Sequence, residues 1–349
     1  MSDVTTTTLP DVTAIVLNWN GAGVVGDCVR SLLQMDYPAL EVLVVDNAST
    51  DDSAEMIRRE FPGVQLQVNE KNLGFGGGNN VGIRLAATPY LLMCNNDTRL
   101  EPDVVRHLVA ALEADPRAGS VTPCIILAAT GRVDATGIVV CPDGLAVGRG
   151  RAEPPEAHTE PAEVFYASDC CCLYRKEMLD DLRLPDGELY DEDFFAYADE
   201  TDMGWRAQRR GWKSLYQPQA RVHHQHASSS GSVSPFLVRL VERNRIWVAV
   251  KNFPKWLIIY GMAWSMCRTF WQVAGALSGR GRAGAMAAKH GKLEMAATLL
   301  RAYGEALAGL PRMCRKRKVI LRSGRLTFGQ IRSIFRRFGI SARDIALRD

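Results

Sequence analysis

Two apolar segments that end in acidic and amide residues constrain this chain more than any other feature of its sequence. Residues 91–97 read Leu-Leu-Met-Cys-Asn-Asn-Asp, so an expected buried strand runs directly into a polar sequence that ends at Asp97. Upstream, the apolar segment 40–45 is followed by Asp46 and Asn47. Open α/β sheets bind their ligands at the carboxyl ends of their strands. The two segments therefore predict one shared crevice for a nucleotide-type ligand.

Strand-like and helix-like segments alternate through the first part of the chain. The expected strands cover 13–17, 41–45, 64–68 and 90–94, and the expected helices cover 24–33, 53–60 and 79–87. This alternation predicts an α/β fold with a mostly parallel sheet flanked by helices. Further along, we expect helices over 102–114, 175–182 and 203–210, strands over 121–127 and 138–141, and a mobile loop over 148–163.

Composition narrows the class of protein. Apolar residues make up 47% of the 349 residues, which is typical of a globular protein and argues against a disordered chain. The 42 basic and 39 acidic residues leave a net charge of +3, so no global basic field predicts a nucleic-acid partner. The nine cysteines form no CxxC pairs, so we expect reduced thiols in a cytoplasmic protein rather than a disulfide framework.

The sequence divides into three expected regions, namely a disordered N-terminus (1–11), an α/β domain (12–235) and a helical, basic and aromatic region (236–349). The N-terminus lacks the basic and apolar parts of a secretory signal. The uncharged run 256–267 is too short for a membrane span of ~20 residues. Its aromatic rings and basic flanks predict peripheral membrane contact through 251–280. A packed subdomain or a homo-oligomer interface is the alternative.

Three carboxylates lie within four residues, at Asp199, Glu200 and Asp202. Crowded acids raise one another's pKa and can supply a general base. The simpler alternative is a solvated first turn of a helix, where acidic residues are common. The preceding aromatic segment 194–197 favours the functional interpretation, because a solvated acidic face rarely follows such a run.

Candidate metal ligands occur in two places. The single carboxylate of Asp97 suits Mg²⁺ or Mn²⁺ when the phosphates of a ligand complete the coordination shell, although it could instead cap the next helix. His223, His224 and His226 lie close together, and histidine is a good ligand for Mn²⁺-type ions. Simple surface polarity is the alternative for these histidines.

Residues 72–80 form a glycine-rich segment that could let backbone N–H groups approach an anion. The segment fits neither the dinucleotide fingerprint GxGxxG nor the P-loop, so dehydrogenase and ordinary ATPase functions lose their main support. Asp46 could accept a hydrogen bond from a base or a ribose hydroxyl, or it could form a turn with Asn47.

Taken in order, these motifs resemble the family 2 glycosyltransferases, and more narrowly their rhamnosyltransferase-like branch, which elongates bacterial surface polysaccharides. The resemblance covers roughly residues 12–250 and lies in the segments 15–20, 44–51, 72–75, 79–82, 95–97, 199–206 and 224–229. It implies a GT-A type, Rossmann-like α/β fold, here followed by a C-terminal helical extension.

The resemblance also implies a role for each matched residue. Asp97 and His224 would hold a divalent cation, Mg²⁺ or Mn²⁺, on the donor diphosphate. Glu200 stands where the family has its catalytic base, but the family's Glu-Asp pair is inverted here, which leaves Asp199 and Asp202 as alternatives. The implied nucleotide-sugar-binding residues are Asn18, Asn20, Asp46, Asn47, Asn72, Gly74, Asn79, Asn80 and Asn96.

The implied function is inverting transfer of a sugar, with L-rhamnose as the leading candidate, to a hydroxyl of a glycan or polyprenol-linked acceptor. The donor would be a dTDP- or UDP-sugar, and the enzyme would act in the cytoplasm or on the inner face of the plasma membrane. A nucleotidyltransferase is one alternative, although segment 18–21 lacks the basic residue expected after its first strand. A non-catalytic sugar-nucleotide-binding protein is the other.

Overall fold

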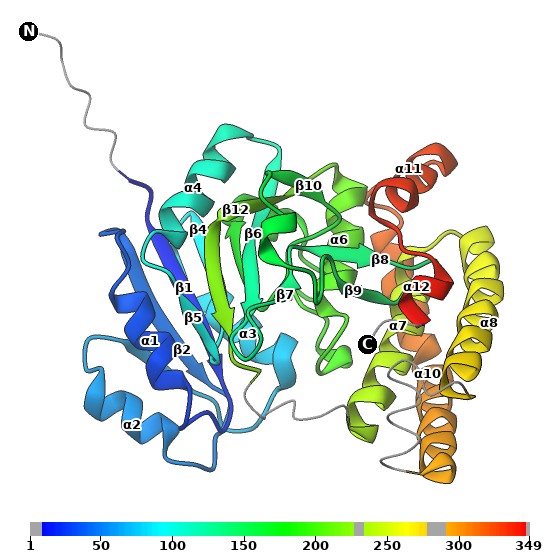
Figure 1. Cartoon of the computed structure of the whole chain (residues 1–349), viewed down its shortest axis with the longest axis horizontal. Helices are drawn as coiled ribbons and strands as arrows, with labels where there is room; N and C mark the ends of the chain where they lie inside the picture. Colours follow the sequence, from blue (N-terminus) through cyan, green and yellow to red (C-terminus); the bar gives the residue numbers. More distant parts are fainter. Residues whose placement is uncertain (1–8, 227–233, 278–290, 347–349) are drawn as a thin grey trace, which may run out of the picture.

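The computed structural model describes residues 9–226, 234–277 and 291–346, and one large mixed sheet lies at its centre (Figure 1). The strands are β1 (Val12–Asn18), β2 (Leu40–Asp46), β3 (Gln65–Val68), β4 (Tyr90–Asn95), β5 (Thr98–Leu100), β6 (Ala118–Leu127), β7 (Val133–Ala135), β8 (Ile138–Val140), β9 (Ala146–Gly148), β10 (Ala162–Val164), β11 (Cys171–Arg175) and β12 (Lys213–His224). The sheet runs in the order β10-β12-β6-β11-β4-β1-β2-β3, with β5 on β12 and β7 on β6, while β8 and β9 form a separate hairpin.

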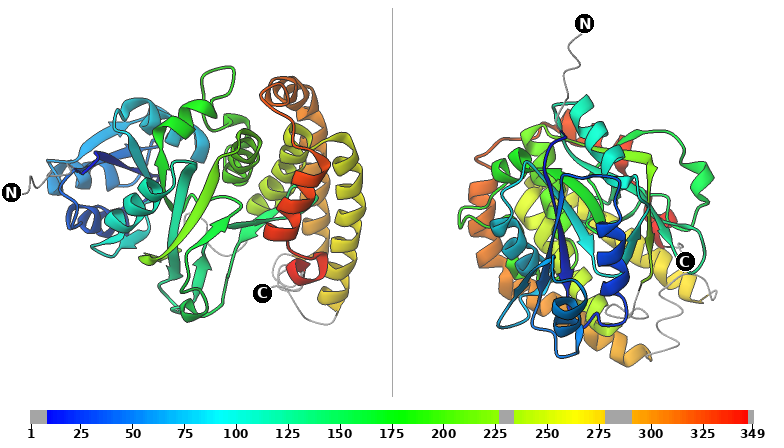
Figure 2. Two further views of the ribbon diagram at one scale, coloured as in Figure 1. Left: turned by 90° about the horizontal axis from the view of Figure 1, so that it is seen from above. Right: turned by 90° about the vertical axis from the view of Figure 1, so that its left-hand side faces the viewer.

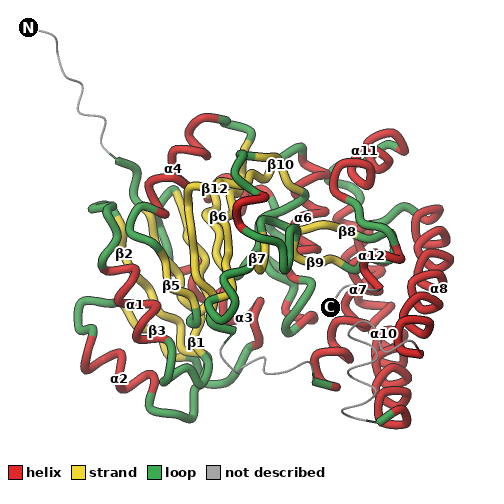
Figure 3. The backbone as a smooth tube through the Cα atoms, viewed as in Figure 1, coloured by secondary structure: helices red, strands yellow, loops and turns green. Residues whose placement is uncertain are grey.

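Helices cover both faces of this sheet, as the backbone tube in Figure 3 shows. They are α1 (Val25–Leu33), α2 (Ser53–Glu60), α3 (Gly74–Leu85), α4 (Val104–Ala114), α5 (Lys176–Asp181), α6 (Asp199–Arg210), α7 (Pro235–Asn252), α8 (Lys255–Leu277), α10 (Lys292–Ile320), α11 (Phe328–Phe338) and α12 (Ala342–Ala346). The predicted α/β class, with a largely parallel sheet and a C-terminal helical region, is confirmed.

The four strands β3-β2-β1-β4 are parallel and place their polar ends together. Asn18 pairs with Asp46 across β1 and β2, and Leu17 pairs with Asn95 across β1 and β4. β1 and β4 are almost entirely buried, and β2 is buried from Val42 onward, because helices pack on both sides of a parallel sheet. The expected convergence of the two polar segments at one edge is therefore confirmed.

The other half of the sheet is mixed and includes β12, a strand that our expectations from the sequence omitted. β12 runs parallel to β6 and antiparallel to β10 and β5. Its side chains alternate between buried and less buried positions, as in a strand with one face on the core. The alternation is easy to miss because the register with β6 shifts between Gln217 and Arg221, around Pro218.

Two other segments also differ from expectation. The helix expected over 79–87 begins earlier, at Gly74, so most of the glycine-rich segment is helical rather than a loop. The loop expected over 148–163 contains a short 3₁₀ turn, Pro155–Ala157, and runs into β10. Most of the N-terminus expected to be disordered lies outside the described residues.

The C-terminal helices stand at the end of the molecule away from α1 and α2 (Figure 2). They share a hydrophobic core with the sheet domain: Trp205 of α6 contacts Phe253 and Phe335, with ring centroids 4.8 Å and 5.8 Å apart. The Nε1–H of Trp247 donates a hydrogen bond to the carbonyl of Ala306 at 3.0 Å, which ties α7 to α10. Among the described helices, none combines the length and apolar character that crossing a membrane requires.

Candidate active site

A cavity of about 590 Å³ opens beside the carboxyl ends of β1 and β4. The lining includes five acidic or histidine side chains that the sequence singled out, from three segments far apart in the chain: Asp97, Asp199, Glu200, His224 and His226. Asn95, Asn96, Cys170 and Tyr197 also line it. The structure therefore brings together the residues on which the predicted chemistry depends.

Asp97 and His224 meet because β5 and β12 pair antiparallel. Thr98, next to Asp97, lies opposite His224 in this register. The Nε2 atom of His224 is 3.2 Å from Oδ1 of Asp97, and both side chains are buried. An imidazole nitrogen and a carboxylate oxygen that face each other in a cavity match the preferences of Mn²⁺ and, on the oxygen side, Mg²⁺. The two residues therefore fit a divalent cation.

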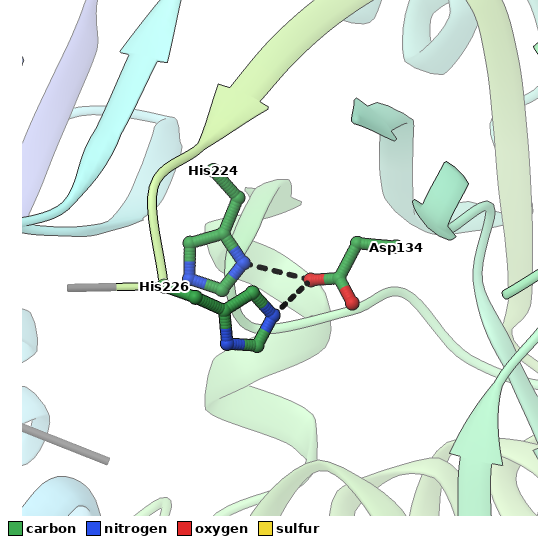
Figure 4. A group of neighbouring side chains, drawn as sticks. All are labelled: Asp134, His224 and His226. Carbon is green, nitrogen blue, oxygen red and sulfur yellow. Dashed lines mark hydrogen bonds and ion pairs between the residues drawn. The ribbon is translucent and has the colours of Figure 1, made fainter. Parts of the chain in front are cut away.

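Asp134, which the sequence did not single out, contacts Nδ1, the other ring nitrogen of His224 (Figure 4). Its Oδ2 atom lies 2.7 Å from Nδ1 of His224 and 3.2 Å from Nε2 of His226, while Oδ1 pairs with Arg151. Burial opposes protonation of His224, but Cys170, Asp134 and Asp97 together raise its pKa.

A carboxylate on the far ring nitrogen is how proteins orient a metal-ligating histidine. The side chains of Asp134, His224 and His226 offer ligand atoms within 4.8 Å of one another, so this group could also hold an ion. Because Asp134 already pairs with Arg151, its contact with Nδ1 orients the His224 ring so that Nε2 faces Asp97.

The acidic turn of α6 is presented by a loop that adopts unusual backbone angles. Phe195, Tyr197 and Ala198 all have positive φ, at 67°, 68° and 66°. The buried side chain of Asn244 donates hydrogen bonds to the carbonyls of Phe194, Ala196 and Tyr197 at 2.8–3.1 Å. These bonds from α7 hold the left-handed loop in place, since such conformations persist only when their surroundings stabilise them.

The glycines of α3 permit close packing against this loop. A Cβ atom at Gly74 would collide with the carbonyl of Phe195, and a Cβ at Gly76 would lie 2.9 Å from Oδ1 of Asp199. Gly74 also has a φ of +76°, which favours glycine. The glycine-rich segment is therefore explained first by helix packing around the acidic turn.

The three candidate bases differ in how their surroundings shift the pKa of each carboxyl group. Burial, reinforced by the charge of Asp169, raises the pKa of Glu200 to about 7. Burial, reinforced by Glu200, raises the pKa of Asp199 well above its usual range, and neither oxygen of Asp199 has a hydrogen-bond partner among the described residues. Glu200 is thus the acid whose ionisation falls near neutral pH, while the surroundings of Asp199 disfavour its ionised form.

Asp202 lies outside the cavity lining and has several buried partners instead. Its carboxylate is 2.9 Å from Nζ of Lys251 and 3.0 Å from Nε of Arg206, and it accepts a hydrogen bond from Asn252 at 2.8 Å. Burial disfavours its charge, but these partners lower its pKa on balance. These contacts describe a structural ion pair between α6 and α7.

Four of the nine predicted nucleotide-sugar-binding residues line the cavity: Asn47, Asn72, Gly74 and Asn96. Asn18 and Asp46 instead form a buried network beneath it. The Nδ2 atom of Asn18 donates to Asp46 at 2.8 Å, and its Oδ1 accepts from Asn96 at 2.8 Å. This network fixes the orientation of Asn96 at the cavity wall.

The other three predicted residues have contacts away from the cavity. The Oδ1 atom of Asn20 accepts a hydrogen bond from the backbone of Thr50 at 2.8 Å. Asn80 makes a pair of hydrogen bonds to the backbone of Tyr190, at 3.0 Å and 2.9 Å, and Asn79 is buried beside it in α3.

Asp134, Asp169 and Trp19 belong to the site but were not predicted. Trp19 lines the cavity while remaining 42% exposed, so an aromatic face is available near its mouth. Trp19 follows the first strand directly and Asp169 lies two residues before β11, so their positions at strand ends could have indicated them.

The class of protein follows from comparison with known families. Residues 13–183 match the family model described as "Glycosyl transferase family 2". Residues 13–183 therefore form a family 2 glycosyltransferase domain, and the chain is an enzyme of the glycosyltransferase class. This match decides against a nucleotidyltransferase.

Curated relatives agree with this assignment. The chain is 26% identical over 224 residues to an N-acetylglucosaminyl-diphospho-decaprenol L-rhamnosyltransferase of Mycobacterium tuberculosis, covering 55% of this chain and 68% of the relative. It is 23% identical over 230 residues to a poly-beta-1,6-N-acetyl-D-glucosamine synthase of Staphylococcus aureus, covering 62% of this chain. The match spans only half of the synthase, at 50%.

Solved structures confirm the GT-A fold. GalNAc-T7, crystallised with UDP, GalNAc and Mn²⁺, is 17% identical with a TM-score of 0.56, over 70% of this chain and 48% of that one. S. aureus TarS 1-349, in complex with UDP-GlcNAc, is 17% identical with a TM-score of 0.52, over 94% of this chain and 90% of that one.

Proposed function

We propose that this enzyme is an inverting glycosyltransferase that moves a sugar from a nucleoside-diphosphate donor to a hydroxyl group of a glycan or lipid-linked glycan, in bacterial surface polysaccharide synthesis. The observation that carries the proposal is that Asp97, His224 and Glu200 line one cavity. A donor diphosphate at Asp97 and His224 would place its sugar within the same enclosed space as Glu200.

Glu200 is the proposed base. It removes the proton from the acceptor hydroxyl as that oxygen attacks the anomeric carbon, and direct displacement inverts the configuration there. Its pKa of about 7 suits this role, because a base works best when its pKa lies near the working pH. Burial and the charge of Glu200 raise the pKa of Asp199 well above its usual range and disfavour its ionised form, and the carboxylate of Asp202 is already paired with Lys251.

The leaving group requires charge neutralisation rather than a protein acid. A divalent cation held by Asp97 and His224, either Mg²⁺ or Mn²⁺, would neutralise charge on the departing diphosphate. Asn72 and Asn96 offer amide groups to the nucleotide from the cavity wall. Asn47 donates a hydrogen bond to Asn72 at 3.0 Å and positions it, while Asn18 and Asp46 support Asn96 from below.

The donor is a dTDP- or UDP-sugar, with L-rhamnose as the leading candidate for the transferred sugar. The M. tuberculosis relative, named as an L-rhamnosyltransferase, supports this choice, and its name also supports a polyprenol-diphosphate-linked acceptor. The test is a thermal-shift measurement with dTDP-L-rhamnose, UDP-N-acetylglucosamine and GDP-mannose, each with and without Mn²⁺. Ligands that bind only the folded state raise its melting temperature. The absence of a shift with all three donors would contradict the proposal.

We also propose that α8 rests on the inner face of the plasma membrane. One stripe of this helix is apolar and exposed, at Ile259 (70%), Met262 (66%), Met266 (73%), Phe270 (65%) and Val273 (54%). Spacings of three and four residues put these side chains on one face. Trp256, beside the exposed Lys255, contacts Phe328 with ring centroids 5.0 Å apart. The last part of the predicted contact segment, 278–280, lies outside the described residues.

Sedimentation with phosphatidylglycerol vesicles tests the membrane proposal. The double change Met266→Glu and Phe270→Glu is expected to abolish co-sedimentation, because it places charges on the apolar stripe. Leu33→Glu on α1, which changes another exposed apolar residue, should leave vesicle binding intact. The unaltered enzyme could instead fail to bind vesicles and form dimers in light scattering that the double change disrupts. That result would identify the stripe as an interface between copies of this chain.

A further inference from the structure

A second hollow, a groove of about 570 Å³, lies between the first half of α10 and the start of α7. The two helices stand side by side at the C-terminal end of the molecule (Figure 1). The residues that line the groove include Phe236 and Arg239 of α7 and Glu294, Ala297, Thr298 and Arg301 of α10. Phe236 lines the candidate active-site cavity as well, so the groove and the cavity adjoin.

The groove meets the cavity on the side of the loop that precedes α6. The ring of Phe236 contacts the ring of Phe195 edge to face, with centroids 6.4 Å apart. Phe195 and Glu200 both line the cavity, and Phe195 belongs to the left-handed loop that presents the acidic turn. A molecule that occupies both the groove and the cavity therefore passes Phe236 and enters on the side from which the proposed base is presented.

The groove carries more basic than acidic side chains. Arg239 and Arg301 line it, whereas Glu294 is the acid of the lining. Glu294 lies seven residues before Arg301, which is about two turns or ~10 Å along α10. The two arginines therefore offer guanidinium charge at the end of the groove away from Glu294.

Neither arginine is fully neutralised by the described residues. Nη1 of Arg239 lies 3.5 Å from Glu305, but the same carboxylate also faces Nη1 of Arg243 at 3.6 Å. One carboxylate is thus shared by two guanidinium groups. Arg301 is exposed and forms no ion pair with any described residue. Guanidinium groups bind phosphate oxygens in a planar, two-pronged geometry, so the pair of arginines is suited to a phosphate ligand.

An exposed apolar stripe borders the basic groove on α10. Leu293 is 88% exposed and Leu300 is 73% exposed. Ala297, which lines the groove, lies four residues after the first and three before the second, so the three side chains share one helix face. Cationic side chains beside exposed apolar ones match a ligand whose anionic group is joined to a hydrocarbon chain.

We propose that this groove binds an isoprenoid diphosphate, with Arg239 and Arg301 on the phosphates and Leu293 and Leu300 against the hydrocarbon chain. The sugar attached to that diphosphate would then reach Glu200 past Phe236, which makes the groove the lipid end of the acceptor site. The acceptor role rests on the proposed function, whereas binding of an isoprenoid diphosphate can be measured by itself.

Calorimetry with farnesyl diphosphate tests the groove. The buffer contains EDTA, so that a metal-dependent donor site does not contribute. Inorganic diphosphate tests for a site that needs no lipid, and a short-chain phosphatidylglycerol below its micelle concentration tests for a general lipid-headgroup site. The variants are Arg239→Gln, Arg301→Gln and the two together. Arg315→Gln is the matched control, because it removes another exposed arginine of the same helix, fourteen residues from Arg301.

We expect the unaltered enzyme to bind farnesyl diphosphate more tightly than either comparison ligand. Each single substitution should weaken this binding by roughly 10–100-fold, the contribution of a hydrogen bond to a charged group, while Arg315→Gln leaves it unchanged. Arg301→Gln should keep the melting temperature of the unaltered enzyme, because Arg301 has no ion pair with a described residue to lose. Equal affinity of the double variant and the unaltered enzyme would overturn the inference.

The lipid part of the assignment has its own variant. Leu300→Glu should weaken binding of farnesyl diphosphate and leave binding of inorganic diphosphate nearly unchanged, because it alters the apolar stripe beside the groove. Inorganic diphosphate that binds as tightly as farnesyl diphosphate would overturn the assignment to an isoprenoid ligand. Equally tight binding of the phosphatidylglycerol would overturn the assignment to a diphosphate.

A competition experiment separates the groove from the donor site. Saturating dTDP or UDP with Mn²⁺ should leave farnesyl diphosphate bound, and loss of its binding would show that it occupies the donor site and would overturn the inference. An enzyme that binds a nucleotide sugar but no farnesyl diphosphate would contradict the inference and leave the proposed function standing. An enzyme that binds farnesyl diphosphate but no nucleotide sugar would overturn the proposed function and, with it, the acceptor role of the groove.

Discussion

Asp97 and His224 meet in the wall of the cavity, with Oδ1 of the first 3.2 Å from Nε2 of the second. The pair exists because β12 returns along β5 and ends beside the turn that follows β4. Its ligand atoms come from two segments far apart in the chain, so the candidate metal site forms only when the whole sheet is assembled. The arrangement leads to a set of predictions about donor binding.

His224→Ala should remove the Mn²⁺ dependence of donor binding. The variant loses a nitrogen ligand, so the affinity for a nucleotide sugar with Mn²⁺ should fall to the level measured without it. Isothermal titration calorimetry with and without Mn²⁺ measures the effect. His223→Ala is the matched control, because that ring points to the other side of β12 and contacts Glu101 at 3.2 Å. An equal Mn²⁺ dependence in His224→Ala and the unaltered enzyme would argue against the site.

Asp134→Asn should weaken Mn²⁺ binding by roughly 10–100-fold, as loss of a group that orients a metal ligand does. The amide can still contact Nδ1 of His224, but it does not supply the carboxylate charge that makes the ring a better ligand. Electron paramagnetic resonance of free Mn²⁺ during a titration gives the affinity. A complete loss of binding would point instead to Asp134 as a direct ligand.

Activity should fall as the pH decreases through about 7. The base must be ionised to accept a proton, and burial together with the charge of Asp169 raises the pKa of Glu200 to about 7. Asp169→Asn removes the neighbouring negative charge, so the acidic limb of its pH–rate profile should move to lower pH. Initial rates at saturating donor across the pH range measure the acidic limb of the unaltered enzyme and of the variant. A limb that stays in place in the variant would contradict the electrostatic coupling.

Lys251→Met should destabilise the fold by about 3–5 kcal/mol, the usual effect of removing one member of a buried ion pair. Nζ of Lys251 lies 2.6 Å from Asp191 and 2.9 Å from Asp202, and the side chain is fully buried. Its loss would leave two carboxylates without their shared cation. Urea unfolding measures the change, with the exposed Lys255→Met as the control. A loss below about 1 kcal/mol would show that the network contributes little.

Much of the fold and of the site follows from local sequence. The strands β1, β2 and β4 were predicted because each is a short apolar run bounded by polar residues. Parallel strands share one carboxyl edge, so the convergence of the segments that end at Asp46 and Asp97 followed from the pattern. The acidic turn at Asp199 and Glu200 was also indicated by its position after an aromatic segment.

The remainder depends on pairing between distant segments. Nothing local tells that Asp134 reaches His224, because their contact is set by how β6, β7 and β12 associate. Whether Asn80 contacts a ligand or the backbone of Tyr190 likewise depends on where α3 packs. The same holds for Asp202, because the sequence predicts a helical region around its partner Lys251 but not how that region packs against α6.

Glu200→Gln gives the most direct measurement of the central claim, that one cavity holds the donor at Asp97 and His224 and the base at Glu200. We predict that this variant binds the preferred nucleotide sugar with unchanged affinity while release of the nucleoside diphosphate in the presence of acceptor falls by roughly 10²–10⁴-fold. Glu177→Gln, on the exposed surface of α5, should behave as the unaltered enzyme. Turnover of Glu200→Gln at the unaltered rate would contradict the account.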